Sequence, residues 1–442
     1  MSTRELFRPF YRLNEIAGLD DIISHDSKIT DLNCLRRSVV TAKDNDTYVM
    51  VRYDKSMITF DLLLLNGMLR SVVFKNRKLL SFAPPKSIPL DSFLKMEEET
   101  KPDQPDEDDE AEEEKKDEMQ GGQCRLEHPD YIVAEEFVEG TMMNVFWDET
   151  KGLAGSWELA TRNNIGGEVT FFKECPKTFR TLFLEATIWN DLDLNSLNKN
   201  YCYSFVLQHP ENRIVVPVQQ PTLYLVDVFQ IMNLEGGEIY VLPLDKSEVK
   251  EWTVWDTTNI RFPEVYEWST YDELKSRFGS MNTSYQIMGV VVRNTQSGIR
   301  TKIRNPVYEM VRHMRGNQPE LQYHYLSLRQ DGKVSEYLKY YPEHKKPFML
   351  FRKSLHDFTD TLFMNYASCY KRKEKPLREF PDNFRTHMFQ LHKLYTEELK
   401  PAGLYITHAI VVRFVNRMDT SLLMYSLNYA IRQMRIDLIE HV

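Results

Sequence analysis

The spacing of apolar residues divides the chain into segments of different kinds. Helix-like spacing near Glu5–Ile23 is followed by strand-like runs at Tyr48–Tyr53, Met57–Leu65 and Ser71–Phe74. The run Met96–Gln120 has no apolar period and is rich in Glu, Asp, Lys and Pro. A segment of this composition cannot bury enough apolar surface to offset the entropy of ordering it, so we expect it to be disordered.

Between residues 131 and 304 the pattern is mostly that of β-strands. One helix is expected to interrupt it, beginning at the capping box Thr270–Glu273 and ending near Gly279. The predicted strands are short runs of β-branched or aromatic residues bounded by turn residues: Val145–Trp147, Ser204–Leu207, Leu223–Phe229, Ile239–Leu242 and Ile287–Arg293.

From Pro306 onward the pattern becomes helical. Met388, Leu391, His392, Tyr395 and Leu399 recur every three or four residues, and Pro401 follows to stop the helix. We therefore predict a mixed α/β body that ends near residue 312 and an all-α domain over residues 313–442. The body is divided into residues 1–95 and 123–312 by an acidic insert at residues 96–122.

Composition narrows the class of protein. A chain of 442 residues with 42% hydrophobic and 12% aromatic residues is expected to be globular. No apolar run approaches the length of a membrane span and no leader pattern opens the chain, so we expect no membrane association. No ligand spacing for zinc is present, so a reducing, cytoplasmic compartment is expected; the cysteines are scattered at Cys34, Cys124, Cys175, Cys202 and Cys369.

The net charge of −9 hides a mildly basic body. Residues 97–118 hold 14 acidic residues against three lysines, so the rest of the chain carries a net charge of +2. A basic body suits a polyanionic partner. The acidic run is either a solvated linker or a mimic of nucleic acid that competes for the basic groove. The cluster at residues 371–375 is either a solvated loop or a contact to an RNA backbone.

Five segments follow one another in an order that suggests a covalent nucleotidyltransferase. They are E-E-F-V-E-G-T (Glu135–Thr141), W-E-L-A-T-R-N-N-I-G-G (Trp157–Gly167), the segment Tyr203–Val216 with H-P-E-N-R-I-V, I-M-G-V-V-V-R (Ile287–Arg293) and T-K-I-R-N-P-V-Y (Thr301–Tyr308). A single match of this kind is weak, whereas five in register are more specific. They resemble motifs I, Ia, III, IV and V of RNA ligases of the phage tRNA-repair type.

The tail carries a second resemblance. Leu328–Glu343 and Phe384–Tyr395 resemble the C-terminal domain of RNA ligases from large DNA viruses. The resemblance implies a nucleotidyltransferase (adenylation) domain of two antiparallel sheets around a cleft, followed by an all-α domain. It also implies RNA, more than DNA, as partner, with ATP and Mg²⁺ as cofactors if the chain is an active ligase.

The positions that carry the family's chemistry are occupied by apolar residues. The motif I lysine, which attacks the α-phosphate of ATP, corresponds to Phe137, and the glutamates of motifs III and IV correspond to Val206 and Met288. Mg²⁺ takes hard oxygen ligands, which valine and methionine lack. The resemblance thus predicts a chain that has lost catalysis, with no cofactor and no metal site.

The positions that face phosphate are better preserved. Glu139 and Gly140 keep the residue types of motif I, with Gly140 leaving room for the base, and Arg162 matches the basic residue of motif Ia. Lys302 and Arg304 occupy the K-x-K positions of motif V. Upstream, Arg70 and Lys86 match looser family elements. These seven residues are the candidate phosphate-binding set, although Arg162, Lys302 and Arg304 would also fit as ordinary surface or core charges.

Alternative hypotheses follow from the same residues. Phe137, Val206 and Met288 either fill a former pocket with core or line a pocket that still binds a nucleotide or RNA end. An active ligase would need a displaced nucleophile, for which Lys75, Lys78 and Lys86 are candidates. The first hypothesis is a non-catalytic nucleic-acid-binding protein of a large DNA virus, in the host cytoplasm, with the virion nucleoid as the alternative location. A structural virion protein that binds other viral proteins is the third.

Overall fold

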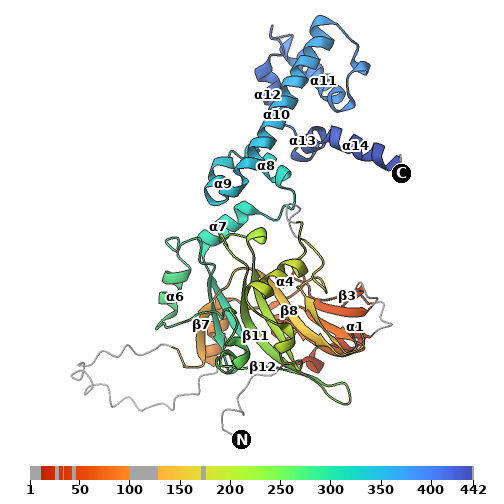
Figure 1. Cartoon of the computed structure of the whole chain (residues 1–442). Helices are drawn as coiled ribbons and strands as arrows, with labels where there is room; N and C mark the ends of the chain where they lie inside the picture. The colour runs from red at the N-terminus through yellow and green to blue at the C-terminus, as the bar shows by residue number, and fades with distance from the viewer. Residues whose placement is uncertain are drawn as a thin grey trace, which may run out of the picture. The chain divides into compact units, whose positions relative to one another are not determined.

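The computed structural model describes residues 11–24, 29–32, 34–41, 46–99, 128–170 and 176–440. These residues form two compact units, and the division lies inside helix α7 (Pro306–Arg315), between His313 and Met314. The first unit holds the strands and helices α1–α6, and the second holds α8–α14, coloured cyan to blue in Figure 1.

The described part of the first unit contains three antiparallel sheets. The six-stranded sheet has the order β1 (Tyr11–Arg12), β12 (Ile239–Pro243), β11 (Thr222–Asn233), β10 (Tyr201–Gln208), β8 (Thr141–Asp148) and β9 (Ser156–Ala160). The five-stranded sheet runs β2 (Asp31–Leu32), β3 (Leu35–Thr41), β4 (Thr47–Tyr53), β5 (Val72–Lys75) and β6 (Lys78–Phe82). The four-stranded sheet runs β13 (Val265–Tyr266), β7 (Ile132–Glu136), β14 (Gly289–Asn294) and β15 (Arg300–Arg304).

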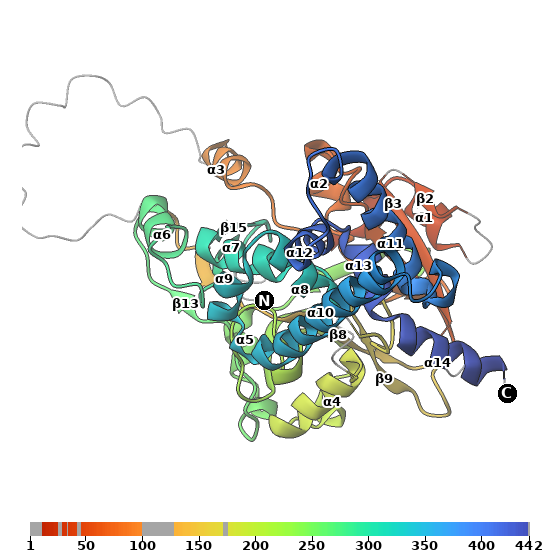
Figure 2. The ribbon, with the colours of Figure 1, turned by 90° about the horizontal axis from the view of Figure 1, so that it is seen from above.

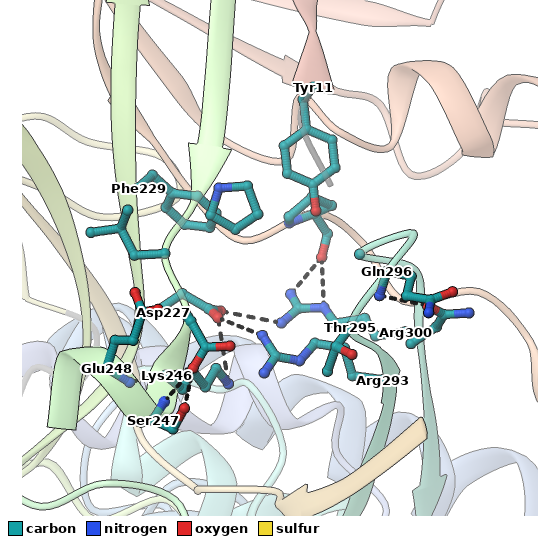
Figure 3. Close-up of a pocket in the computed structure, with 16 residues that line it drawn as sticks. Tyr11, Asp227, Phe229, Lys246, Ser247, Glu248, Arg293, Thr295, Gln296 and Arg300 are labelled. Atoms are coloured by element: carbon teal, nitrogen blue, oxygen red, sulfur yellow. Dashed lines mark hydrogen bonds and ion pairs between the residues drawn. The ribbon is translucent and has the colours of Figure 1, made fainter. Parts of the chain in front are cut away.

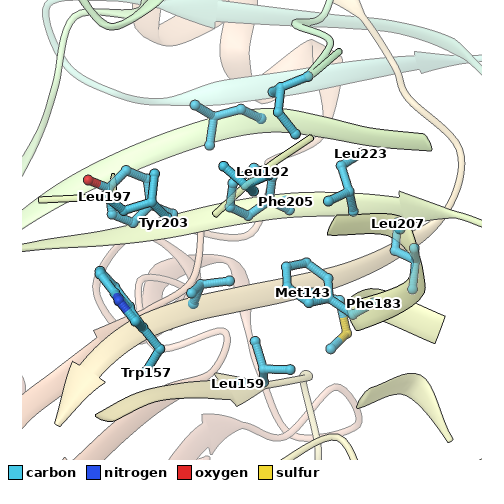
Figure 4. Close-up of a cluster of buried hydrophobic side chains, with 14 of the residues drawn as sticks. Met143, Trp157, Leu159, Phe183, Leu192, Leu197, Tyr203, Phe205, Leu207 and Leu223 are labelled. Atoms are coloured by element: carbon cyan, nitrogen blue, oxygen red, sulfur yellow. The ribbon is translucent and has the colours of Figure 1, made fainter. Parts of the chain in front are cut away.

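Successive side chains of β10 point to opposite faces of the six-stranded sheet, and both faces are apolar there. Tyr203, Phe205 and Leu207 join a cluster with Phe183 of α4 (Phe179–Trp189), which covers this face (Figure 4). Val206, between them, points to the opposite face because successive side chains of a strand alternate. The interior of the first unit is therefore built from both faces of β10, whose residues 202–207 are all buried.

The other two sheets are covered in different ways. The five-stranded sheet packs on the six-stranded one, where Tyr48, Met50 and Val73 meet Phe146 and Cys202. The four-stranded sheet is covered on one face by α3 (Leu90–Glu99) and α6 (Tyr271–Phe278), visible in Figure 2. The remaining helices of this unit are short: α1 (Leu19–Ile23), α2 (Phe60–Asn66) and α5 (Lys246–Lys250).

The second unit is helical throughout its described residues. Its central helix α10 (Lys345–Tyr366) buries Phe348, Leu355, Phe358, Leu362 and Tyr366, a spacing of three, four and seven residues that marks a single apolar stripe. Around it lie α8 (Leu321–Gln330), α9 (Val334–Tyr340), α11 (Asp382–Leu394), α12 (His408–Asn416), α13 (Thr420–Leu427) and α14 (Tyr429–Glu440).

Much of the predicted pattern is confirmed. Four of the five strand runs between residues 145 and 293 lie within strands, and the fifth, Ile287–Arg293, begins two residues before β14. Thr270 caps α6 by accepting a hydrogen bond from the backbone N–H of Glu273 at 3.0 Å. The periodic segment that begins at Met388 lies in α11 and in the π-helical turn Tyr395–Leu399 that extends it. The helical C-terminal region is also as expected.

Three expectations are wrong. Met57–Leu65 was predicted as a strand, but residues 60–65 lie in α2, because leucine is not branched at Cβ and favours helix, and only Leu63 of the four leucines is buried. Two sheets were expected, and the described residues form three, since the N-terminal strands pair with one another. The acidic insert was expected from residue 96, but α3 continues to Glu99 and the rest of the insert lies outside the described residues.

The described residues include no helix that has both the length and the apolar character needed to cross a bilayer.

The cluster under α4 is expected to dominate the stability of the first unit. Phe205 is fully buried there, with its ring 5.9 Å from that of Phe183. Phe205→Ala should lower the free energy of unfolding by about 3–5 kcal/mol through lost burial and a cavity. Ile188→Ala, on the exposed side of α4, should change it by less than about 0.5 kcal/mol. Denaturant titration followed by tryptophan fluorescence measures both, and equal effects would contradict this packing.

Candidate phosphate-binding pocket

The three positions at which apolar residues stand in place of the family's catalytic residues lie around one pocket. Phe137 follows the last residue of β7, Val206 lies in β10 and Met288 directly precedes β14. All three line a cavity of about 300 Å³ whose walls come from the six-stranded and the four-stranded sheet. The order of motifs along the chain is therefore matched by their proximity in space.

One wall of this pocket is apolar. Val206 is buried and packs with Val138 and Tyr224, and the partly buried Met142 and Val226 lie against them. Position 206 thus belongs to a small hydrophobic cluster, and Met288 adds a thioether rather than an oxygen. Neither residue can hold a divalent ion, because Mg²⁺ prefers carboxylate and water oxygens.

The opposite wall is strongly basic. The Lys302 Nζ lies 4.0 Å from the centroid of the Phe137 ring, and the Arg304 guanidinium carbon lies 5.8 Å from it. Cations over an aromatic face are attracted by its quadrupole, so Phe137 supports the basic side chains where the family has a lysine. Arg70 also lines this wall.

These cations depress one another's affinity for protons. Burial, together with the charges of Arg300, Arg70, Arg304 and Lys86, lowers the pKa of Lys302 to about 6. Burial and Arg300 lower the pKa of Arg70 to about 10. A pocket that holds this much unbalanced positive charge is prepared for an anion.

Two of the predicted phosphate ligands lie outside the pocket lining. Arg162 stacks over Tyr53, with its guanidinium carbon 5.0 Å from the ring centroid, and its Nε is buried without a hydrogen-bond partner. Lys86 donates a long hydrogen bond of 3.5 Å to the carbonyl of Ser87. Burial, and after it the charge of Arg162, lowers the pKa of Lys86. Both side chains add to the positive potential beside the pocket.

Glu139 has a structural task. Its Oε1 accepts hydrogen bonds from the backbone N–H groups of Val215 and Val216 at 3.0 and 3.1 Å, and Tyr308 donates a further one. These bonds fasten the segment after β7 to the segment after β10. Because these hydrogen bonds already occupy the carboxylate of Glu139, it is poorly suited to hold a metal ion. Burial outweighs the hydrogen bonds and raises the pKa of Glu139.

Gly140 is required by the backbone of β10. Its φ is +149°, and a Cβ placed on it would lie 2.5 Å from the carbonyl oxygen of Leu207 and 2.6 Å from Cγ1 of Val206. The sequence suggested that this glycine leaves room for a base. The space that it leaves is filled by β10 instead.

A second cavity, of about 390 Å³, adjoins the first, and Figure 3 draws the residues that line it. Lys246, Arg293 and Arg300 line both cavities and converge on Asp227 at 3.4, 3.6 and 3.7 Å. Glu135 completes the network, at 2.6 Å from Lys246 and 2.9 Å from Arg293. Three cations here pair with two carboxylates, which balances most of the charge, and this network forms a wall between the cavities.

The candidates for a displaced nucleophile are poorly placed. Lys75 lies 2.8 Å from Asp148 and 2.9 Å from Asp46; burial alone would lower its pKa, but these hydrogen bonds raise it. Lys78 is exposed and pairs with Glu149 at 3.3 Å. Neither lysine lines the pocket, and Lys86 does not either. The lysine that the pocket does present as a weakly protonated amine is Lys302.

The described residues contain one group with the composition of a metal site: Glu185, His209 and Glu211. The Lys177 ammonium already lies between the two carboxylates, 2.9 Å from Glu185 and 2.5 Å from Glu211. His209 is buried and accepts a hydrogen bond from the backbone N–H of Glu211, as expected of a packed turn histidine. This cluster is accounted for as an ion-pair network.

Sequence reasoning missed several pocket residues. Arg300 alternates with Lys302 and Arg304 along β15, and this period of two could have placed all three on one face. Lys55, Tyr308 and Arg312 also line the pocket. Nothing in the sequence around Lys55 signalled that role.

Comparisons with known proteins support the coarse resemblance. No family model matches the chain. Over 285 residues it is 25% identical to an RNA ligase of Rhodothermus phage RM378, covering 57% of this chain and 61% of the phage protein. Over 214 residues it is 22% identical to the immediate-early protein ICP-46 homolog of Invertebrate iridescent virus 6, covering 46% of this chain and 44% of the viral protein. The chain thus spans less than two thirds of the length of either relative.

Solved structures of the Naegleria gruberi RNA ligase also match. A mutant form with ATP and Mn is 12% identical over 62% of this chain and 76% of the ligase, with a TM-score of 0.34. The form with PPi covers 64% of this chain and 94% of the ligase at a TM-score of 0.28. Scores this low carry no argument. The similarity that stands is that of sequence, to a phage RNA ligase.

The approach of β10 to Gly140 gives a test of this geometry. Gly140→Ala should lower the free energy of unfolding by more than about 2 kcal/mol, because it adds a backbone clash to the strain of a positive φ. Gly152→Ala is the matched control: its φ is +66° with open space around it, so only about 1 kcal/mol of strain is expected. Denaturant titration of both variants measures the difference, and similar losses would contradict the close approach.

Proposed function

We propose that this chain is an RNA-ligase-like protein of the nucleotidyltransferase fold that binds nucleic acid, RNA more than DNA, without catalysing ligation. One observation carries the proposal: Phe137, Val206 and Met288 line the same pocket as Arg70, Lys302 and Arg304. The positions for nucleophile and metal are apolar, while cations still face the cavity. The sequence similarity to a phage RNA ligase supports the choice of substrate class.

The pocket does not fit the family's metal-assisted reaction. Removing a covalent enzyme's nucleophile costs on the order of 10⁶-fold in rate. The carboxylates that line the pocket are engaged with other groups of the chain, and cations dominate the remaining charge. We therefore expect neither ATP nor Mg²⁺ to be a working cofactor. Residence in the host cytoplasm or virion of a large DNA virus, and binding of other viral proteins, belong to the same proposal and rest on resemblance.

A second candidate function is supported by the state of Lys302. An active ligase with a displaced nucleophile needs a neutral amine at the pocket, and Lys302 supplies one, whereas Lys75 is held as an ammonium. The absence of any free carboxylate in the described lining argues against this reaction. Covalent AMP on Lys302 would establish it.

The proposal predicts no covalent intermediate. After incubation with α-labelled ATP and Mg²⁺ or Mn²⁺, denaturing electrophoresis should show no labelled protein. A parallel filter assay should show RNA binding that weakens with salt, as expected of phosphate contacts. An acid-labile labelled band, mapped by mass spectrometry to a lysine, would overturn the non-catalytic function.

Restoring the lysine alone should not restore chemistry. Phe137→Lys places an amine at the motif I position, but Val206 and Met288 still offer no oxygen to a metal ion. We expect no adenylylation of this variant in the same labelling assay. The triple variant Phe137→Lys, Val206→Glu, Met288→Glu is the comparison, in which partial recovery is allowed. Labelling of the single variant would contradict the account.

Arg70 should contribute to RNA affinity through charge. Arg70→Gln is expected to weaken RNA binding and to reduce the slope of log K against log salt by about 0.7, the value for one contact to a single strand. Lys78→Gln is the matched control, because Lys78 is a cation outside the lining. Filter binding over a range of salt concentrations measures both slopes. An unchanged slope for Arg70→Gln would remove this residue from the site.

A further inference from the structure

Three cations of the pocket have no carboxylate partner among the described residues. The other cations of the lining are paired: Lys246 and Arg293 with Glu135, Arg300 with Asp227, and Arg304 and Arg312 with Glu309. The unpaired ones are Lys55, Arg70 and Lys302. Of these, Lys302 is the side chain that lies on the Phe137 ring.

The carboxylates of the lining do not neutralise Lys302. Glu135 is held by Lys246 and Arg293, and these charges lower its pKa against the opposing effect of burial. Glu139 is held by backbone N–H groups. Glu136 accepts a hydrogen bond of 3.4 Å from the backbone N–H of Glu264, and burial raises its pKa. The carboxylates of the described lining therefore leave Lys302 without a matching negative charge.

A divalent cation would make the imbalance worse. Each added positive charge repels the charges already present, and this repulsion is strong where water is partly excluded. An anion that carries two negative charges relieves the imbalance directly. A phosphate monoester or a terminal polyphosphate group has that charge, and it has the acceptor oxygens that arginine and lysine bind.

We propose that the pocket binds a terminal phosphate dianion together with one proton, that Lys302 carries this proton, and that no divalent cation takes part. The proposal deepens the proposed function and rests on it, since it names the chemical group of the nucleic acid or nucleotide that this pocket holds. The phosphate could belong to an RNA 5′ end or to a free nucleotide, and both sources share this chemistry.

The direction of the pH dependence follows from the charges. In the empty pocket Lys302, with its pKa of about 6, is mostly a neutral amine above neutral pH. A bound dianion favours the ammonium form and raises that pKa, so binding takes up a proton. Affinity should then fall by up to about tenfold per pH unit as the pH rises above about 7. Below about pH 6 the gain ends, because Lys302 is already charged and the phosphate itself gains a proton near pH 6.

The charged groups that face Lys302 come from several elements. Arg300 and Arg304 lie on the same strand, and Arg70 and Lys86 act on Lys302 from the N-terminal part of the unit. The other charged or titratable groups of the lining are Lys55, Glu135, Glu136, Glu139, Lys246, Arg293, Tyr308 and Arg312. A variant that changes Lys302 alone separates its titration from that of the carboxylates.

Calorimetry of the full chain in EDTA tests the proposal. The ligands are a 5′-phosphorylated RNA oligonucleotide, the same oligonucleotide with a 5′-hydroxyl, and ATP. Titrations at one pH in buffers with different ionisation enthalpies give the number of protons taken up. Near pH 7.5 we expect an uptake approaching about one proton with the phosphorylated ligand that binds, and none with the 5′-hydroxyl RNA. Which of RNA and ATP shows this uptake identifies the source of the phosphate.

Two substitutions of Lys302 separate the effect of its charge from the effect of its titration. Lys302→Arg carries a permanent charge, so it should bind the phosphate at pH 8.5 at least as well as wild type and should take up no proton. Lys302→Met removes both charge and titration, and it should lose the advantage of the 5′-phosphate. Circular dichroism of each variant checks that the fold is intact.

The possible failures can be told apart. Phosphate binding without proton uptake, uptake that persists in Lys302→Arg, or binding that disappears in EDTA and returns with Mg²⁺ would each overturn this inference while RNA binding still stands. Absence of all RNA and ATP binding would overturn both the inference and the proposed function. Covalent AMP on the protein would overturn the non-catalytic function, whatever the proton count.

Discussion

The pocket depends on the hydrogen bonds that Glu139 accepts from the backbone of Val215 and Val216. They join the segment that leaves β7 to the segment that follows β10, and both segments contribute residues to the lining of the cavity. Phe137 lies two residues before Glu139, with its ring against Lys302. Glu139 thus serves the architecture of this pocket.

Charge balance then decides what the cavity can do. In the ion-pair wall, Lys246, Arg293 and Arg300 pair with Asp227 and Glu135. In the smaller cavity, Lys55, Arg70 and Lys302 have no carboxylate partner among the described residues. A phosphate group is the natural partner of the smaller cavity, and the apolar residues at positions 137, 206 and 288 leave it without the oxygens that a catalytic metal requires.

Sequence reasoning succeeded where local pattern determines structure. Runs such as Ser204–Leu207 are β-branched or aromatic and lie in β10, and Thr270 caps α6 as its spacing implies. It failed at α2, where four leucines in a row have no period and were assigned to a strand although leucine is a good helix former. The third sheet could not be predicted either. The spacing of apolar residues identifies single strands, but it does not show which strands pair, as β3 does with β4.

For the site, the three positions that the motif order singled out, Phe137, Val206 and Met288, line one pocket. Motif order could not anticipate the burial of Lys75 against Asp148, which removes that lysine as a nucleophile. The most direct test of the account is a crystal structure of the chain with a 5′-phosphorylated RNA dinucleotide in EDTA. The account predicts the phosphate within hydrogen-bond distance of Arg70, Lys302 and Arg304. A phosphate bound elsewhere, with this pocket closed or empty, would contradict it.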